Sequence, residues 1–126
     1  MKFIKQKIDG LFIIEHDIYE DSRGAFRRSF CLDELKREGI KFEAKQGNIS
    51  ENKNKYTMRG FHYQKGSEKE SKILSCLSGG IYNVVIDLRK NSLTYKKLFS
   101  IELNSFNRCS LLVPGGCANA FLTMQD

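Results

Sequence analysis

The sequence predicts an all-β protein of the sandwich or jelly-roll type with one short helix. Three observations support this prediction. Short apolar segments of strand length recur along the 126 residues, and turn signals rich in Gly, Asn, Asp and Ser separate them. Only the segment Leu32–Glu38 has convincing helix signals, and the chain contains no internal repeat or low-complexity run. About nine short strands joined by turns are typical of a sandwich or jelly roll.

The first half is expected to form three strands, at Leu11–Ile14, Ala25–Phe30 and Phe42–Ser50. Turn signals at Asp9-Gly10 and Asp21–Gly24 precede the first two strands. Asp33 and Glu34 suit the first turn of the helix, because carboxylates interact favourably with a helix N-terminus, and Gly39 suits its end.

The second half is expected to form six strands, at Met58–Gln64, Lys72–Leu77, Ile81–Leu88, Leu98–Leu103, Cys109–Val113 and Cys117–Met124. The turn Ser78-Gly79-Gly80 predicts a β-hairpin between the two strands that flank it. The turn Asn104–Arg108 predicts that the strands on either side of it form another pair. Pro114-Gly115-Gly116 is the turn before the last strand.

The strand Met58–Gln64 carries the residues with the clearest chemical potential. Its alternation predicts a half-buried strand with Met58, Gly60, His62 and Gln64 on one face and Arg59, Phe61 and Tyr63 on the other. His62 is one of two histidines in the chain, and an imidazole held on a rigid strand can act as a general base near neutral pH. Arg59 could hold a phosphate. The alternative is a histidine that only packs in an ordinary strand.

Composition bounds the class of protein. A length of 126 residues predicts one domain, spanning residues 1–126. No signal peptide or apolar run of transmembrane length is visible, so we expect a soluble, cytoplasmic protein. The 4 cysteines contain no Cys-x-x-Cys pair, which favours free thiols in a reducing compartment. Lys plus Arg exceed Asp plus Glu by 21 − 15 = 6. This balance suggests a nucleic acid, a phosphorylated small molecule, or simply a lysine-rich surface.

Several kinds of site find little support. His62 with the amides Gln64 and Asn119 would make a weak transition-metal site. No nucleophile elbow, phosphate-binding loop or RNA-recognition motif occurs. A proton-transfer site for a phosphate-bearing substrate remains, in which His62 abstracts a proton and Lys72 stabilises the oxyanion that develops. Lys72 could also be an ordinary surface lysine at the start of a strand.

The ordered set of motifs resembles one family over essentially the whole chain. The motifs are Asp21-x-Arg23-Gly24-x-Phe26, Gln46-Gly47-Asn48-Ile49-Ser50, Arg59-Gly60-Phe61-His62-Tyr63-Gln64, Lys72-Ile73-Leu74, Val85-Ile86-Asp87-Leu88-Arg89 and Pro114-Gly115-Gly116-Cys117-Ala118-Asn119-Ala120-Phe121. Together they are similar to the dTDP-4-dehydrorhamnose 3,5-epimerases. The resemblance implies a cupin-type jelly roll (a double-stranded β-helix), a homodimer, and no metal or organic cofactor. It also implies an isomerase that inverts C3 and C5 of a nucleotide-linked 4-keto-6-deoxy sugar, in the biosynthesis of rhamnose or related surface polysaccharides.

The resemblance also assigns site residues. His62 takes the role of the base, and Lys72 faces the enolate oxygen. The substrate contacts are expected at Arg23, Arg28, Gln46, Asn48, Arg59 and Asn119. Three positions depart from the family pattern: Asn119 stands in place of a histidine, Arg28 in place of an acid, and Asn83 in place of an aspartate.

The resemblance leaves more than one function open. The family's proton-returning tyrosine and the aspartate that orients its base belong to a C-terminal part without a counterpart here, so we expect one domain that lacks that part. Losing a general acid or base typically slows a reaction by about 100- to 10,000-fold. The two main hypotheses are therefore an epimerase and a non-catalytic or degenerate nucleotide-sugar-binding relative. A basic nucleic-acid-binding barrel is the third and least favoured, and we expect neither a nucleic acid nor a membrane as partner.

Overall fold

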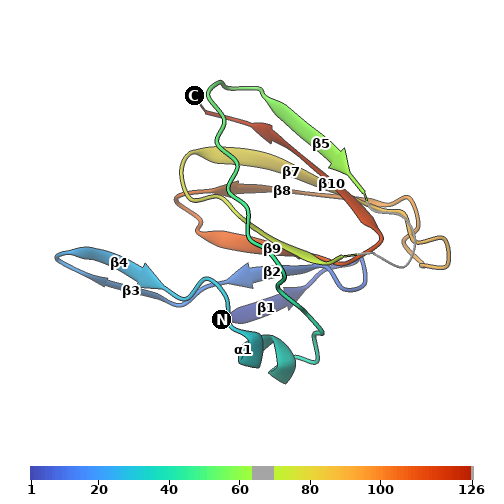
Figure 1. Cartoon of the computed structure of the whole chain (residues 1–126), viewed down its shortest axis with the longest axis horizontal. Helices are drawn as coiled ribbons and strands as arrows, with labels where there is room; N and C mark the ends of the chain where they lie inside the picture. The colour runs from blue at the N-terminus through green and yellow to red at the C-terminus, as the bar shows by residue number, and fades with distance from the viewer. Residues whose placement is uncertain (64–69, 126) are drawn as a thin grey trace.

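The structure is a computed structural model that describes residues 1–63 and 70–125. Its strands form two four-stranded sheets, with the strand orders β1-β2-β9-β6 and β5-β10-β7-β8, and a separate hairpin β3-β4 (Figure 1). The elements are β1 (Lys2–Lys5), β2 (Phe12–Glu15), β3 (Ile18–Asp21), β4 (Gly24–Arg27), α1 (Leu32–Arg37), β5 (Met58–His62), β6 (Lys72–Ser75), β7 (Gly80–Asp87), β8 (Leu98–Asn104), β9 (Cys109–Val113) and β10 (Cys117–Thr123). The predicted all-β class with one short helix is confirmed.

The main hydrophobic core lies between the two large sheets. Leu111 and Val113 of β9 face Val85 of β7 and Leu103 of β8 across this layer, and all four side chains are almost fully buried. A second, smaller core covers the other face of the β1-β2-β9-β6 sheet, where Leu112 packs with Leu35 of α1. Neighbouring residues of β9 therefore point to different cores, as the two-residue period of a strand requires.

The helix forms where the sequence predicts it. Asp33 and Glu34 occupy its first turn, and Lys36 and Arg37 its last, so the charges at both ends suit the helix dipole. The described part of the chain contains no helix with the length and apolarity needed to cross a bilayer.

Both predicted strand pairs of the second half are wrong. β6 pairs with β9 rather than with β7, and β8 pairs with β7 rather than with β9. The turns at Ser78-Gly79 and Asn104–Arg108 reverse the chain, but each one carries it from one sheet to the other. Turn residues determine a change of direction, whereas burial of two apolar faces determines which strands become neighbours.

The predicted strand Phe42–Ser50 is also wrong. This segment has no strand geometry; it is part of the long connection that runs from α1, at the bottom of the view, to β5 at the top (Figure 1). Only Phe42 is anchored, because it packs against the smaller core and its ring centroid lies 5.8 Å from that of Phe30. The polar residues that follow are exposed and gain no ladder of backbone hydrogen bonds.

Candidate functional site

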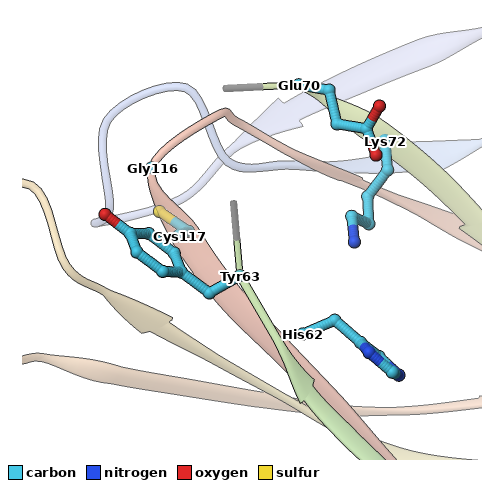
Figure 2. A pocket seen from close by; sticks show the side chains of 6 residues that line it. All are labelled: His62, Tyr63, Glu70, Lys72, Gly116 and Cys117. Carbon is cyan, nitrogen blue, oxygen red and sulfur yellow. The ribbon is translucent and has the colours of Figure 1, made fainter. Parts of the chain in front are cut away.

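A cavity of about 340 Å³ opens between the two large sheets, beside their edge strands β5 and β6 (Figure 2). Its described walls are formed by His62, Tyr63, Glu70, Lys72, Gly116 and Cys117. His62 ends β5 and Lys72 begins β6, so the two residues expected to move a proton come from different sheets and line one space. In Figure 2 the Lys72 side chain extends toward the side of the cavity where the imidazole lies.

A β-bulge in β5 sets the direction of His62. Asn119 of β10 pairs with His62, and Phe121 of β10 pairs with Arg59. The pairs are two residues apart in β10 but three residues apart in β5, so β5 contains one extra residue. Asn119 and Phe121 share a face of β10, and the bulge therefore brings Arg59 and His62 to one face. The predicted alternation, which placed them on opposite faces, is wrong because it did not include the extra residue.

Glycine is required at position 60 inside this bulge. Gly60 has φ +110°, and a Cβ atom there would lie 2.6 Å from the carbonyl oxygen of Asn119. This close approach lets β5 follow β10 to the rim of the cavity. Every residue of β5 is exposed, so the predicted half-buried strand is wrong: β5 is an edge strand whose inner side faces a cavity instead of packed side chains. Gln64, the last residue of the predicted strand, lies outside the described residues.

A pair of neutral amides joins β7 to β10, the strand that pairs with β5. The Nδ2 group of Asn83 donates a 2.8 Å hydrogen bond to Oδ1 of Asn119, and both side chains are buried. Asn83 Oδ1 is buried without a hydrogen-bond partner in the part of the chain that the structure describes. Asn119 pairs with His62 between β10 and β5 but is not among the residues that line the cavity, so its expected substrate contact stays a prediction.

The cavity combines groups suited to proton transfer. No hydrogen bond joins the imidazole of His62 to another described residue, and His62 is exposed and lines the cavity. Lys72 supplies a cation, and Tyr63 and Glu70 supply groups that can donate or accept protons. Within residues 1–63 and 70–125, no three His, Cys, Asp or Glu side chains converge where they could hold a metal ion.

Comparisons with known proteins agree with this arrangement. The family model described as dTDP-4-dehydrorhamnose 3,5-epimerase matches residues 5–126. The chain belongs to the dTDP-4-dehydrorhamnose 3,5-epimerase family. The enzyme of that name from Methanothermobacter thermautotrophicus is 34% identical over 125 residues, which are 99% of this chain and 66% of the relative. The one from Escherichia coli K12 is 31% identical over 127 residues, 100% of this chain and 68% of the relative.

Solved structures give the same result. The crystal structure of dTDP-4-dehydrorhamnose 3,5-epimerase from Elizabethkingia anophelis aligns with a TM-score of 0.92 at 34% identity, over 99% of this chain and 68% of that one. An epimerase from Legionella pneumophila, in complex with dTDP-4-keto-L-rhamnose, aligns with a TM-score of 0.90 at 33% identity, over 98% and 65%. The chain thus spans about two thirds of the length of these relatives.

Most substrate contacts expected from the epimerase family lie away from this cavity. Arg23 is at the tip of the β3-β4 hairpin, where its side chain is 88% exposed and its Nη2 lies 2.6 Å from Asp21 Oδ2. Arg28 Nη1 pairs with Glu34 Oε2 at 3.1 Å. Arg59 donates from Nε to Asn52 Oδ1 at 2.6 Å. The remaining two, Gln46 and Asn48, are exposed on the extended segment. None of these residues lines the cavity, in contrast to His62 and Lys72.

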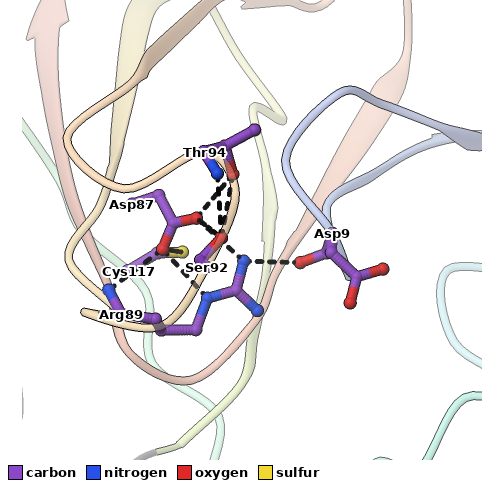
Figure 3. A network of polar contacts seen from close by, with 6 residues as sticks. All are labelled: Asp9, Asp87, Arg89, Ser92, Thr94 and Cys117. Atoms are coloured by element: carbon purple, nitrogen blue, oxygen red, sulfur yellow. Dashed lines mark hydrogen bonds and ion pairs between the residues drawn. The ribbon is translucent and has the colours of Figure 1, made fainter.

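The epimerase-family motif at Asp87 forms a buried network beside the cavity (Figure 3). Asp87 accepts hydrogen bonds from Arg89 Nε at 2.9 Å and from the hydroxyl groups of Ser92 and Thr94, both at 2.6 Å. Burial alone would raise the pKa of Asp87, but these hydrogen bonds outweigh it and hold the pKa well below its usual range. Arg89 also donates from Nη2 to the carbonyl oxygen of Asp9 at 2.7 Å, which ties the first turn of the chain to this loop.

The same network reaches the cavity wall through Cys117. Its thiol donates to Asp87 Oδ1 over 3.8 Å, and Cys117 lines the cavity. Burial raises the pKa of Cys117 to about 11, so the thiol stays protonated and structural.

Sequence reasoning did not assign Tyr63, Glu70, Gly116 or Cys117 to the site. Glu70 could have been found from its place two residues before Lys72, because residues separated by two lie on one side of an extended chain. The predicted alternation put Tyr63 on the face opposite His62, and the list of expected site residues did not include it.

Proposed function

We propose that this chain acts as a nucleotide-sugar 3,5-epimerase of the dTDP-4-dehydrorhamnose type. One observation supports this most strongly: His62 and Lys72 come from different sheets and line the same cavity between them. A base and a cation facing one space are what removal of a proton next to a ketone requires. Family membership supplies the substrate class, a nucleotide-linked 4-keto-6-deoxy sugar.

The proposed reaction consists of proton abstraction and proton return. His62 removes the proton from the carbon beside the C4 ketone, and the electron pair moves onto the ketone oxygen. The Lys72 ammonium group stabilises that enolate oxygen. Return of a proton to the opposite face of the carbon inverts it, and the ketone allows the same sequence at C3 and C5. Tyr63 is the hydroxyl in the described cavity wall that could return the proton.

We also propose that the protein is a homodimer in which the β3-β4 hairpin contacts the second copy. The hairpin projects away from the body of the molecule (Figure 1). It carries the exposed side chains of Tyr19 and Phe26, which are 67% and 70% exposed, and Arg23 at its tip. A second copy that accepts this hairpin would cover the aromatic surface and could receive the arginine.

A reducing compartment such as the cytoplasm is part of the proposal. All 4 cysteines are free in the structure, and two of them, Cys76 and Cys117, are buried. Rhamnose or a related surface polysaccharide is the expected destination of the product.

The test is proton exchange followed by NMR in deuterated water, with dTDP-4-keto-6-deoxyglucose as the probe. The purified chain should incorporate deuterium at C3 or C5, and His62→Ala should abolish incorporation. Slow exchange is expected, because no partner orients His62 in the described chain. Exchange at an unchanged rate in His62→Ala would remove His62 from the mechanism and overturn the proposal.

The second candidate function is binding of a nucleotide-sugar without catalysis. Two observations favour this alternative: among the described residues none bonds the imidazole of His62, and the buried Asn83–Asn119 pair is neutral. Calorimetric binding of the same keto sugar without any deuterium incorporation over days would support it. Incorporation that His62→Ala abolishes would rule it out.

A further inference from the structure

The second histidine of the chain, His16, joins three parts of the fold. Its Nδ1 lies 2.7 Å from the backbone carbonyl oxygen of Arg28, and its Nε2 lies 2.7 Å from the hydroxyl oxygen of Ser110. The Ser110 hydroxyl in turn lies 2.5 Å from that of Ser75. His16 stands between β2 and β3, and Arg28 directly follows β4, so the ring contacts both legs of the β3-β4 hairpin at its root.

The carbonyl group determines the polarity of this chain of hydrogen bonds. A carbonyl oxygen can only accept, so Nδ1 must carry the hydrogen. In the neutral ring Nε2 then accepts, and the Ser110 hydroxyl must donate to it. Ser110, which is 1% exposed, can accept from Ser75 at the same time. Both ring nitrogens of His16 and the buried hydroxyl group of Ser110 are therefore satisfied in one arrangement.

The hairpin has few other contacts that could hold its direction. β3 is fully exposed and β4 nearly so, and among the described elements each makes its extensive contacts only with the other. Glu20 pairs with Arg108 at 2.8 Å, and Asp17 with the N-terminal ammonium group at 3.2 Å, but both carboxylates are mostly exposed. Exposed ion pairs hold geometry weakly. The His16 bond to Ser110 instead ends on a buried group of the central strand β9.

We propose that His16 is a positioning residue that clamps the root of the β3-β4 hairpin to the β1-β2-β9-β6 sheet. It fixes the direction in which the hairpin presents Arg23 and its aromatic side chains. Their use at a substrate or a second copy rests on the proposed function, whereas the clamp itself does not. The bridge needs both ring nitrogens, so no other side chain should replace His16.

The first test is spectroscopic. Long-range ¹H–¹⁵N NMR of the full chain, at a pH where His16 is neutral, should show the hydrogen on Nδ1 and an accepting Nε2. A ring with its hydrogen on Nε2, or one that averages between the two tautomers, would overturn the proposed polarity.

The second test measures the direction of the hairpin through residual dipolar couplings. In the unmodified protein, the couplings of Ile18–Arg27 should fit the alignment tensor of the two large sheets. His16→Gln keeps an acceptor for Ser110 but loses the donor to Arg28, and Ser110→Ala loses the anchor on β9. In both variants the hairpin couplings should shrink while those of the sheets stay unchanged. Hairpin amides should exchange about fivefold faster, as expected for the loss of one net hydrogen bond.

Ser75→Ala is the matched control, because it shortens the same chain of hydrogen bonds without touching His16; its couplings should equal those of the unmodified protein. Unchanged hairpin couplings in both His16→Gln and Ser110→Ala would overturn the proposal.

These measurements need no substrate, so a failed deuterium-exchange test would reject the epimerase function and leave the clamp intact. Rejection of the clamp would in turn leave the epimerase proposal unaffected, because His62 and Lys72 would still line the cavity.

Discussion

At the residue scale, the two sides of the proposed reaction depend on different side chains. His62 must lose and gain a proton, whereas Lys72 only has to place positive charge near an oxygen. Lys72→Ala should therefore slow deuterium incorporation by about 100-fold or more, the usual cost of removing one oxyanion donor. Lys90→Ala is the control and should leave the rate unchanged, because Lys90 is an exposed lysine in the loop between β7 and β8. A rate in Lys72→Ala equal to that of the control would assign the stabilisation of the enolate to another group.

Arg28 should alter the choice of nucleotide. A guanidinium group can only donate hydrogen bonds, whereas the acid expected from the family can accept them from a pyrimidine base. Glu34, the partner of Arg28, has its pKa lowered to about 2 by the N-terminal ammonium group and then by Arg28, so this ion pair persists at neutral pH. We expect calorimetry to show weaker binding of dTDP than of a nucleoside diphosphate whose base edge is richer in acceptors. Arg28→Glu should reverse the order, and a clear preference of the unmodified protein for dTDP would contradict this prediction.

At the scale of single elements, the bulge in β5 depends on Gly60. Gly60→Ala would add the strain of a side chain at φ +110° and a clash with Asn119. We expect the free energy of unfolding in urea to fall by about 1 kcal/mol for the strain and by about a further 1–3 kcal/mol for the clash. Gly39→Ala is the matched control, because Gly39 has φ +72° but no atom within 4 Å of a new Cβ. Equal losses in both variants would mean that the close approach of β5 to β10 is not needed.

The loop after β7 depends on Asp87. Asp87→Asn should lower the free energy of unfolding by about 3 kcal/mol at pH 7, because Arg89 then loses its buried charged partner. The pKa of Asp87 is lowered in the folded state, so its stabilising contribution is complete above the unfolded-state pKa of about 3.9. The contribution declines as the pH falls from there toward the lower folded-state pKa. Urea unfolding of both proteins should therefore show a constant difference at neutral pH and a shrinking one in acid. A difference that grows in acid would contradict the assigned role.

At the scale of the whole molecule, the exposed aromatic hairpin should determine oligomeric state. Light scattering should give about twice the chain mass of 14.5 kDa. The pair Tyr19→Ser and Phe26→Ser should shift the protein to monomer, because it removes the largest exposed apolar side chains of the hairpin. Leu93→Ser is the control, since Leu93 is an even more exposed apolar residue outside the hairpin. A clean monomer of the unmodified chain at micromolar concentration would contradict the dimer.

The sequence by itself determined the class, the positions of most elements and the family. Alternation and turn residues predicted β7 through β10 closely, and Asp33, Glu34 and Gly39 predicted the helix. These signals are local, because each depends on the backbone preferences of a few adjacent residues. The ordered motifs predicted His62 as the base and Lys72 as the cation that stabilises the enolate oxygen.

Only the tertiary structure decided which strands pair and which residues share the cavity. The chain reverses at Ser78-Gly79 and at Asn104–Arg108 as predicted, but it crosses between sheets at both turns, because only two facing sheets can bury Val85 and Leu111 together. The bulge that turns His62 into the cavity depends on the contact of Gly60 with β10, which is remote in the sequence. The bridge from His16 to Ser110 spans 94 positions. Contacts of this kind leave no periodic pattern, since their energy comes from burial and hydrogen bonds between segments that meet only in the folded chain.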